Sequence, residues 1–233
     1  MTGIYIFLGM VVFWSIFLTI IFRLEKRMVW PYGKLESAPQ VDDPSGYATS
    51  RVAELQAAGF TMLGWAPDLK GSKYQVSYAM LVPPERDAFV VVGMGRVINI
   101  PVATTWVYTP TTDGCCFYST DKQGGVQLDV SRNWTNQLVP SASVTQLLSS
   151  HREWMRGNQA MQRPFTRGRE LEEFRIMRQE HYQHMKRAGL IDFIDAGASY
   201  FRFTLTGAAK TAISGYFLGM SRQITGGRLP RNA

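Results

Sequence analysis

The chain begins with an apolar run that holds no charged side chain from residue 4 to residue 22. A helix of this length extends about 28 Å, close to the ~30 Å apolar core of a bilayer. Ser15 and Thr19 lie within the run, and a helix can absorb such hydroxyls by hydrogen bonds to its own carbonyls. The run favours a membrane helix over a soluble core helix.

The charges around this run separate an anchor from a cleaved export signal. A signal peptide has a basic start and a small-residue cleavage site behind its apolar segment. Here no basic side chain precedes the run, and Arg23, Lys26 and Arg27 follow it directly. We therefore predict a retained single transmembrane helix with a basic flank, residues 1–27. Because Lys and Arg concentrate on the cytoplasmic side, we expect the N-terminus outside the cell (inner) membrane and the bulk of the chain in the cytoplasm.

Residues 28–46 are rich in proline and glycine, without a sustained period, and are predicted to be a linker. Helical spacing follows at residues 47–58, and again at residues 143–158, where Ser143 and Gln146 have the spacing of a capping box. Between them, turn signals separate six runs rich in β-branched and aromatic residues: residues 60–70, 74–83, 88–94, 97–110, 115–121 and 125–131. Short connections favour antiparallel neighbours. The pattern predicts an α+β domain at 47–158, an antiparallel meander of five to six strands flanked by helices.

The section from residue 159 to residue 233 returns mainly to helical spacing. Thr166 is predicted to cap a helix that runs to about Ala188, where Gly189 ends it. Two short strands are expected within residues 190–205. Thr206 is then expected to cap a closing helix. The sequence thus predicts a basic helix–hairpin–helix segment at 159–233.

This last segment carries a local resemblance to the end of a winged-helix domain. The motifs are Gly189-Leu190-Ile191 after a basic helix, a possible wing from Asp192 to Phe203, and Leu205-Thr206-Gly207 at the start of a closing helix. The resemblance covers about 40 of the 233 residues. It implies a DNA-binding helix and wing, with four phosphate-facing candidates: Arg175, Arg178, Lys186 and Arg187. The acidic Asp192 and Asp195 depart from the basic wings of that family.

The net charge of +7 lies entirely in the C-terminal third of the chain. Residues 1–150 hold 11 basic and 11 acidic side chains, whereas residues 151–233 hold 14 and 7. Such an asymmetry indicates a face for an anionic partner. The predicted lipid- or partner-facing groups are Arg23, Lys26, Arg27, Arg175, Arg178, Lys186 and Arg187.

The sequence offers only weak candidates for catalysis or metal binding, and it predicts no cofactor, no metal and no catalytic residue. Adjacent Cys115 and Cys116 are expected to be free thiols in a cytoplasmic domain. His181 and His184 have a spacing that can share a metal, but no third ligand is evident. His151 could serve as a base for Cys116, although a core histidine satisfied by hydrogen bonds is the commoner arrangement.

Two further patterns, one of glycines and one of aromatic residues, bear on ligand binding. Gly93 and Gly95 lack the third glycine of a dinucleotide fingerprint and are better explained by a bulge or a close strand crossing. A curved sheet could hold an apolar ligand, with four aromatic residues as walls: Trp65, Tyr78, Trp106 and Tyr108. The same residues also suit an ordinary aromatic core.

The function predicted from these observations is interaction rather than catalysis. The chain would be a single-pass membrane protein with a scaffold role, such as an accessory subunit of a membrane complex, whose partners are the lipid bilayer and a protein in or at the membrane. A membrane-tethered regulator with a winged-helix-like segment, binding nucleic acid or another partner, is the alternative. A further alternative is a ligand-binding or enzymatic domain without a recognisable motif. A cleft in which His151, Cys116 or Asp129 converge would favour that alternative.

Overall fold

The computed structural model of the 233-residue chain describes residues 2–29, 34–39, 41–43, 45–67, 74–97, 100–121, 134–140, 143–198 and 200–212. The N-terminal part contains α1 (Thr2–Leu24), β1 (Arg27–Met28) and α2 (Tyr47–Ala57). Six strands form a large sheet in chain order: β2 (Thr61–Pro67), β3 (Tyr74–Val82), β4 (Phe89–Val97), β5 (Ile100–Pro110), β6 (Cys116–Thr120) and β7 (Trp134–Leu138). The C-terminal part contains α3 (Val144–Gly157), α4 (Glu170–Arg187), β8 (Ile191–Phe193) and β9 (Tyr200–Phe203), and a helix at residues 205–212 follows.

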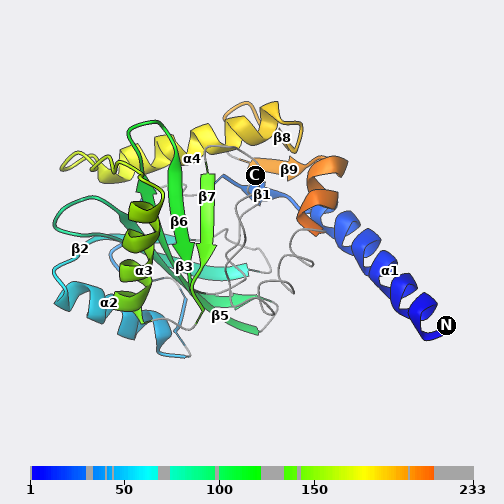
Figure 1. The fold of residues 1–233 in the computed structure, drawn as a ribbon, viewed down its shortest axis with the longest axis horizontal. Coiled ribbons are helices and arrows are strands. Elements are labelled where there is room, and N and C mark those ends of the chain that lie inside the picture. The colour runs from blue at the N-terminus through cyan, green and yellow to red at the C-terminus, as the bar shows by residue number, and fades with distance from the viewer. Residues whose placement is uncertain are drawn as a thin grey trace.

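Helices cover both faces of the large, mainly antiparallel sheet. The protein is therefore α+β, as the sequence predicts. Side chains alternate between the two faces along each strand. Leu81, Val90 and Val92 pack with residues of α2 and α3 on one face. On the other face, Met80, Phe89 and Val91 pack with residues of α4. The sheet is therefore the middle layer of three (Figure 1).

The contact between α4 and the sheet is aromatic at its centre. Phe174 of α4 stacks on Phe89 of β4 with ring centroids 4.0 Å apart and ring planes 3° apart. Tyr108 of β5 meets the ring of Phe174 edge-on at 5.2 Å. All three side chains are buried to 1% exposure or less. This stack fixes α4 on the sheet.

The prediction of an antiparallel meander is right for β2 to β6, but the sheet continues with β7 at residues 134–138, which is not among the predicted strands. Each of the first five strands pairs antiparallel with the next, but β7 pairs parallel with β6, which makes the sheet mixed. A parallel connection needs about a dozen residues or more, and residues 121–133 supply that length. The strand predicted at 125–131 lies outside the described residues.

A second, smaller sheet joins the segment that follows α1 to the hairpin at residues 191–203. Its strand order is β1-β9-β8. β9 pairs antiparallel with both neighbours, and Arg27 of β1 lies opposite Phe201 of β9. The predicted hairpin is thus present, while residues 27–28, expected in the anchor flank and linker, form a third strand of the same sheet.

The structure confirms one of the predicted helix caps and places two others at different residues. Ser143 accepts from Gln146 N, and the Gln146 side chain accepts from Ser143 N, which completes the predicted capping box. α4 begins at Glu170, not beside Thr166, and Arg169 at its N-cap makes no side-chain cap bond. The closing helix is capped by Thr204, whose hydroxyl accepts from Gly207 N at 3.0 Å, instead of by Thr206. The remainder of the predicted closing helix, from residue 213, lies outside the described residues.

In the part of the chain that the structure describes, no helix combines the length and apolarity needed to cross a membrane. The predicted transmembrane helix therefore has no support from this criterion.

Candidate membrane and partner interface

The helix α1 exposes large apolar side chains along its described length. Phe13 is 63% exposed, Ile16 56% and Leu24 71%. Figure 1 shows the helix extending away from the rest of the protein. Soluble monomers rarely leave large apolar patches uncovered. α1 therefore has the surface of a helix that contacts lipid or another protein.

The two hydroxyls of this helix are satisfied within it. Ser15 Oγ donates to Val11 O at 2.8 Å, and Thr19 Oγ1 donates to Ser15 O at 2.7 Å. Each bond runs back one helical turn, as the sequence predicts. The hydroxyls thus need no water or partner, and they add little to the cost of placing α1 in an apolar environment.

The three basic residues predicted at the end of α1 contact the small sheet and hold the base of the helix against it. Arg23 Nη1 donates to Phe203 O at 3.0 Å. Lys26 Nζ lies 3.7 Å from the centroid of the Tyr200 ring. Arg27 forms an ion pair with Glu25 at 2.6 Å, and its guanidinium carbon lies 5.1 Å from the centroid of the Phe203 ring. The end of α1 is consequently fixed relative to β9; Arg23 and Lys26 stay exposed, whereas Arg27 is partly buried.

Among the predicted basic residues of α4, Arg178 lies inside the protein. Its side chain is 2% exposed and donates to Tyr182 Oη at 2.9 Å. The guanidinium carbon also lies 5.4 Å from the centroid of Trp134 and 6.0 Å from that of Tyr108. Arg178 follows Phe174 by one helical turn and so shares its buried face. It does not reach an outer surface where lipid, DNA or a partner could bind.

The other three predicted residues of α4 lie nearer the surface. Arg175 is partly buried, and Lys186 and Arg187 are exposed. Lys186 Nζ lies 5.3 Å from the centroid of the Phe193 ring in β8. Arg187 lines a shallow open groove of about 620 Å³ along the outer face of α4, together with Ile176 and His184. Of the three, Arg187 alone lines this groove.

Sequence reasoning missed two exposed residues near the base of α1. Arg202 lies on the outward side of β9, between the buried Phe201 and Phe203, and Leu205 at the start of the closing helix is 68% exposed. The alternation of buried and exposed residues at 201–203 was the available signal. That alternation predicts a strand, but nothing in the sequence places the strand beside α1.

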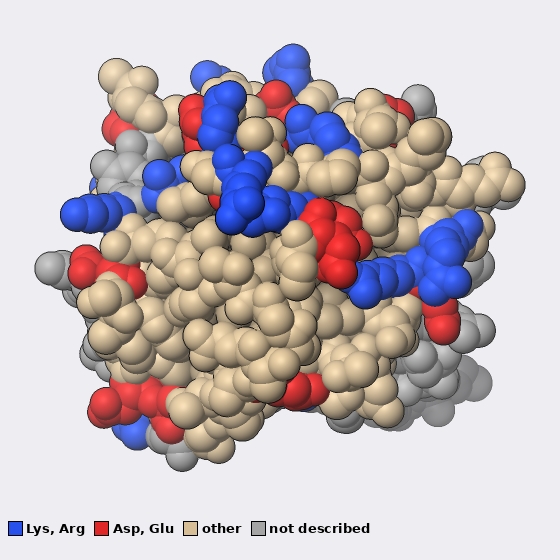
Figure 2. Space-filling view, turned by 90° about the vertical axis from the view of Figure 1, so that its left-hand side faces the viewer, with Lys and Arg blue, Asp and Glu red and all other residues tan. Residues whose placement is uncertain are grey.

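A second group of basic residues lies far from α1, around the N-terminal end of α4. Arg163, Arg167 and Arg169 are exposed. Figure 2 shows Lys and Arg side chains gathered mainly in the upper part of the face opposite the projecting α1, with acidic side chains among them. α4 is 18 residues long, which separates its two ends by about 27 Å. Positive charge is thus divided between the two ends of the molecule.

The sheet separates His151 from Cys116, the pair considered for thiol catalysis. Cys116 is buried among residues on the α4 face. His151 lies on the α3 face, where its Nδ1 is 2.7 Å from Ser119 Oγ and its Nε2 is 3.0 Å from Thr109 Oγ1. Burial also raises the pKa of the Cys116 thiol, which disfavours the nucleophilic thiolate. His151 is a core histidine with both ring nitrogens bonded, and Asp129 lies outside the described residues.

The histidine pair on α4 does not form a metal site with other ligands. His181 is 2% exposed, and its ring lies 4.3 Å from that of Trp134, whereas His184 is partly exposed on the groove. No group of three or more potential metal-ligating side chains lies together among the described residues. Both cysteines are free.

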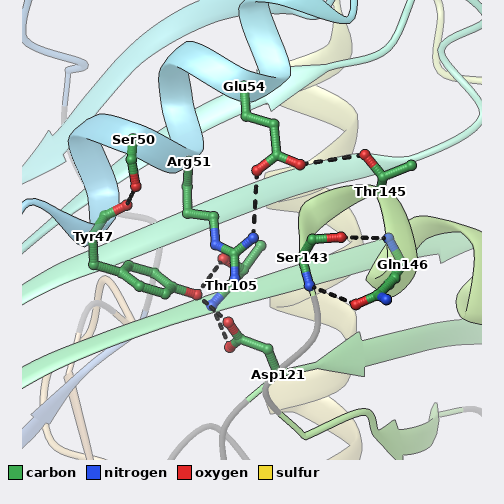
Figure 3. A network of polar contacts seen from close by, with 9 residues as sticks. All are labelled: Tyr47, Ser50, Arg51, Glu54, Thr105, Asp121, Ser143, Thr145 and Gln146. Atoms are coloured by element: carbon green, nitrogen blue, oxygen red, sulfur yellow. Dashed lines mark hydrogen bonds and ion pairs between the residues drawn. The ribbon is translucent and has the colours of Figure 1, made fainter.

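A buried carboxylate joins α2 to the sheet. Asp121, directly after β6, is 4% exposed and accepts hydrogen bonds from the Tyr47 hydroxyl and from Thr105 N, the latter at 2.8 Å. Burial, and then the bond to Asp121, raise the pKa of Tyr47 to about 12. Figure 3 shows that the polar network continues along α2 to Glu54, which accepts from Thr145 of α3. The network links α2, the sheet and α3.

The four aromatic residues predicted as ligand walls do not share one face of the sheet. Trp65 packs with the α2 and α3 cluster. Tyr78, Trp106 and Tyr108 pack with the α4 cluster. Gly93 lies beneath Tyr78 and Trp106, and a Cβ at that position would come within 2.9 Å of the Trp106 ring. The glycine thus permits close aromatic packing over β4, within a regular register that has neither a bulge nor a strand crossing at Gly93.

The two buried histidines make the fold sensitive to acid. Burial lowers the pKa of His151 and of His181 to about 3, and the nearby Arg152 and Arg178 add to the respective effects. The unfolded chain takes up a proton at each site near pH 6.5, so stability is fully present above that pH and is lost as the pH falls toward 3. We expect each histidine to cost about 1.4 kcal/mol for each pH unit below 6.5.

Unfolding free energies in mild detergent between pH 7 and pH 4.5 test this expectation. The variant His151→Asn should lose stability at pH 7, yet show a pH slope shallower than the wild type by about one proton. An unchanged slope would contradict the assignment of His151 as a neutral core residue.

No protein-family model, curated protein or solved structure matches this chain.

Proposed function

We propose that the protein is a single-pass membrane protein whose body acts in interaction or scaffolding, as an accessory subunit of a membrane complex would. Residues 4–22 are the anchor, the N-terminus lies outside the cell (inner) membrane, and the body is cytoplasmic. The observation that carries the proposal is the exposed apolar surface of α1, with Phe13 and Ile16 more than half exposed on a helix that leaves the body.

The anchor rests on the printed sequence as well as on α1, since the described residues alone do not supply a spanning helix. Thirteen of the residues from 4 to 22 are Leu, Ile, Phe or Val. On an insertion scale they favour the membrane by about 4–8 kcal/mol in sum. Arg23, Lys26 and Arg27 at the end of α1 favour a cytoplasmic position for everything that follows.

The attachment of α1 supports a scaffold role. Arg23 bonds to β9, the small sheet packs with the C-terminal half of α4, and Phe174 stacks the other half on the large sheet. An anchor joined in this way holds the body in one orientation to the bilayer. The basic group at the N-terminal end of α4 then points away from the membrane, where an acidic protein surface is the fitting partner.

Sealed vesicles of both orientations test location and topology. We expect the protein to resist alkaline extraction, and a cysteine introduced by Glu153→Cys on exposed α3 to react with an impermeant maleimide only from the cytoplasmic side. The variant is made in a Cys115→Ser background, and buried Cys116 does not compete. Extraction at alkaline pH, or labelling from the outer side, would contradict the proposal.

A membrane-tethered regulator is the second candidate, and the three-stranded sheet favours it. β1 adds a strand to the hairpin beside α4, which is closer to a winged-helix arrangement than the hairpin alone. The accessible basic candidates are then Lys186 and Arg187, with Arg175 partly buried. Retarded migration of duplex DNA by the detergent-solubilised chain, lost in Lys186→Glu/Arg187→Glu, would support DNA binding. Free migration of the DNA at low salt would exclude it.

A further inference from the structure

The closing helix at residues 205–212 lies beside the base of α1 (Figure 1). Its start packs against Gly189 and Leu190, which directly precede β8. Thr204 N donates to Leu190 O at 2.9 Å, and the Thr204 hydroxyl donates to Gly189 O at 2.7 Å. A Cβ at Gly207 would overlap the carbonyl oxygen of Leu190, so only glycine permits this approach. The start of the helix is therefore a fixed surface feature.

Two leucines are exposed at this junction. Leu24 ends α1, and Leu205 begins the closing helix; they are 71% and 68% exposed. The hydrogen bond from Arg23 to Phe203 O places the two segments side by side. Each leucine thus lies within two residues of that bond, and neither is covered by the body of the protein.

The charges of the junction are unequal. Arg23 and Lys26 are exposed, and their partners are a carbonyl oxygen and a tyrosine ring, neither of which carries a charge. The acidic residues nearby are offset: Glu25 pairs with Arg27, and Asp192 lies opposite Arg202 across the hairpin. Asp195 accepts from Tyr200 N at 2.7 Å in the hairpin turn. Arg23 and Lys26 thus exceed the one remaining carboxylate, Asp195, and leave a net positive charge beside the exposed leucines.

We propose that this junction surface, made of Arg23, Leu24, Lys26 and Leu205, lies in the headgroup region of the bilayer and binds acidic phospholipids. The inference rests on the proposed membrane position of α1. Leucines beside basic residues suit the boundary between headgroups and acyl chains, where apolar side chains enter and cations meet lipid phosphates. The closing helix is then a second contact with the membrane, next to the anchor.

Fluorescence quenching in nanodiscs tests the surface with the full chain. In the Cys115→Ser background, one probe is attached at Thr206→Cys, on the exposed side of the closing helix, and another at Phe13→Cys in α1. The discs hold phosphatidylcholine alone or with phosphatidylglycerol, and carry nitroxides at shallow or deep positions. We expect shallow nitroxides to quench the probe at 206 and deep ones to quench the probe at 13. Quenching at 206 should rise about twofold or more when phosphatidylglycerol is added.

The variant Arg23→Gln/Lys26→Gln should abolish the increase with phosphatidylglycerol and leave the probe at 13 quenched as before. The matched control, Arg163→Gln/Arg167→Gln, removes two exposed charges at the other end of the molecule and should leave the increase intact. Quenching at 13 without quenching at 206 would overturn the junction surface alone. Equal quenching at 206 in both lipids would overturn the selection of acidic headgroups. An unquenched probe at 13 would overturn the proposed anchor.

Discussion

Lysines at Phe13 and Ile16 are expected to release the protein from the membrane. Each lysine near the centre of a membrane helix costs about 2.5–3.5 kcal/mol. Two of them therefore offset most or all of the ~4–8 kcal/mol by which the apolar residues favour insertion. Both positions are more than half exposed on α1, so the substitutions leave the packing of the body unchanged. Alkaline extraction of membranes, followed by quantitative immunoblotting, should find most of the variant in the supernatant.

The matched control for this experiment is Ile176→Lys. Ile176 is 48% exposed on the outer face of α4, so it accepts a charge without loss of core packing. This variant should stay with the membranes as the wild type does. If Phe13→Lys/Ile16→Lys also stays, attachment does not depend on α1, and the proposed anchor is wrong.

Replacement of Phe174 by alanine is expected to be among the most damaging single changes in the core. The side chain is fully buried, stacked on Phe89 and met edge-on by Tyr108. Truncation of a buried phenylalanine costs about 3–5 kcal/mol, through lost transfer energy and the cavity that remains. For a chain of this size, the midpoint of thermal unfolding should fall by about 6–20 °C.

Thermal unfolding in detergent, followed by circular dichroism, measures this effect against Ile176→Ala. That control truncates an exposed side chain two residues away on the same helix, and it should change stability by no more than about 0.5 kcal/mol. Equal losses in the two variants would show that the contact between α4 and the sheet contributes little.

Local patterns were enough to predict most regular elements of the body, although β1 and β7 were not among them. The run of β-branched and aromatic residues gave the five antiparallel strands, and the Ser143–Gln146 pair marked the start of α3 correctly. These features depend on residues within a few positions of one another, where periodicity and turn chemistry decide the structure. The burial of Arg178 was also within reach, because it lies four residues from both Phe174 and Tyr182 on one helix face.

Long-range pairings gave no such signal. β7 lies parallel to β6 after a long connection, and β1 finds β9 near the other end of the chain. Neither strand partner can be identified from spacing, since pairing depends on where the intervening chain folds. The sequence placed Arg23 and Lys26 among the lipid- or partner-facing residues, but it gave no sign that Leu205 lies beside them, because Leu205 comes from a distant segment.

The bond between Arg23 and Phe203 spans 180 residues, and this sets an order of events during synthesis. At roughly 5–20 residues per second, a ribosome needs about 9–36 s to make the chain between them. α1 is therefore complete long before its partner strand exists. The backbone groups of β1 that pair with β9 have no partner until the hairpin leaves the ribosome. A product truncated before residue 200 would carry α1 and β1 but no β9 to close the small sheet.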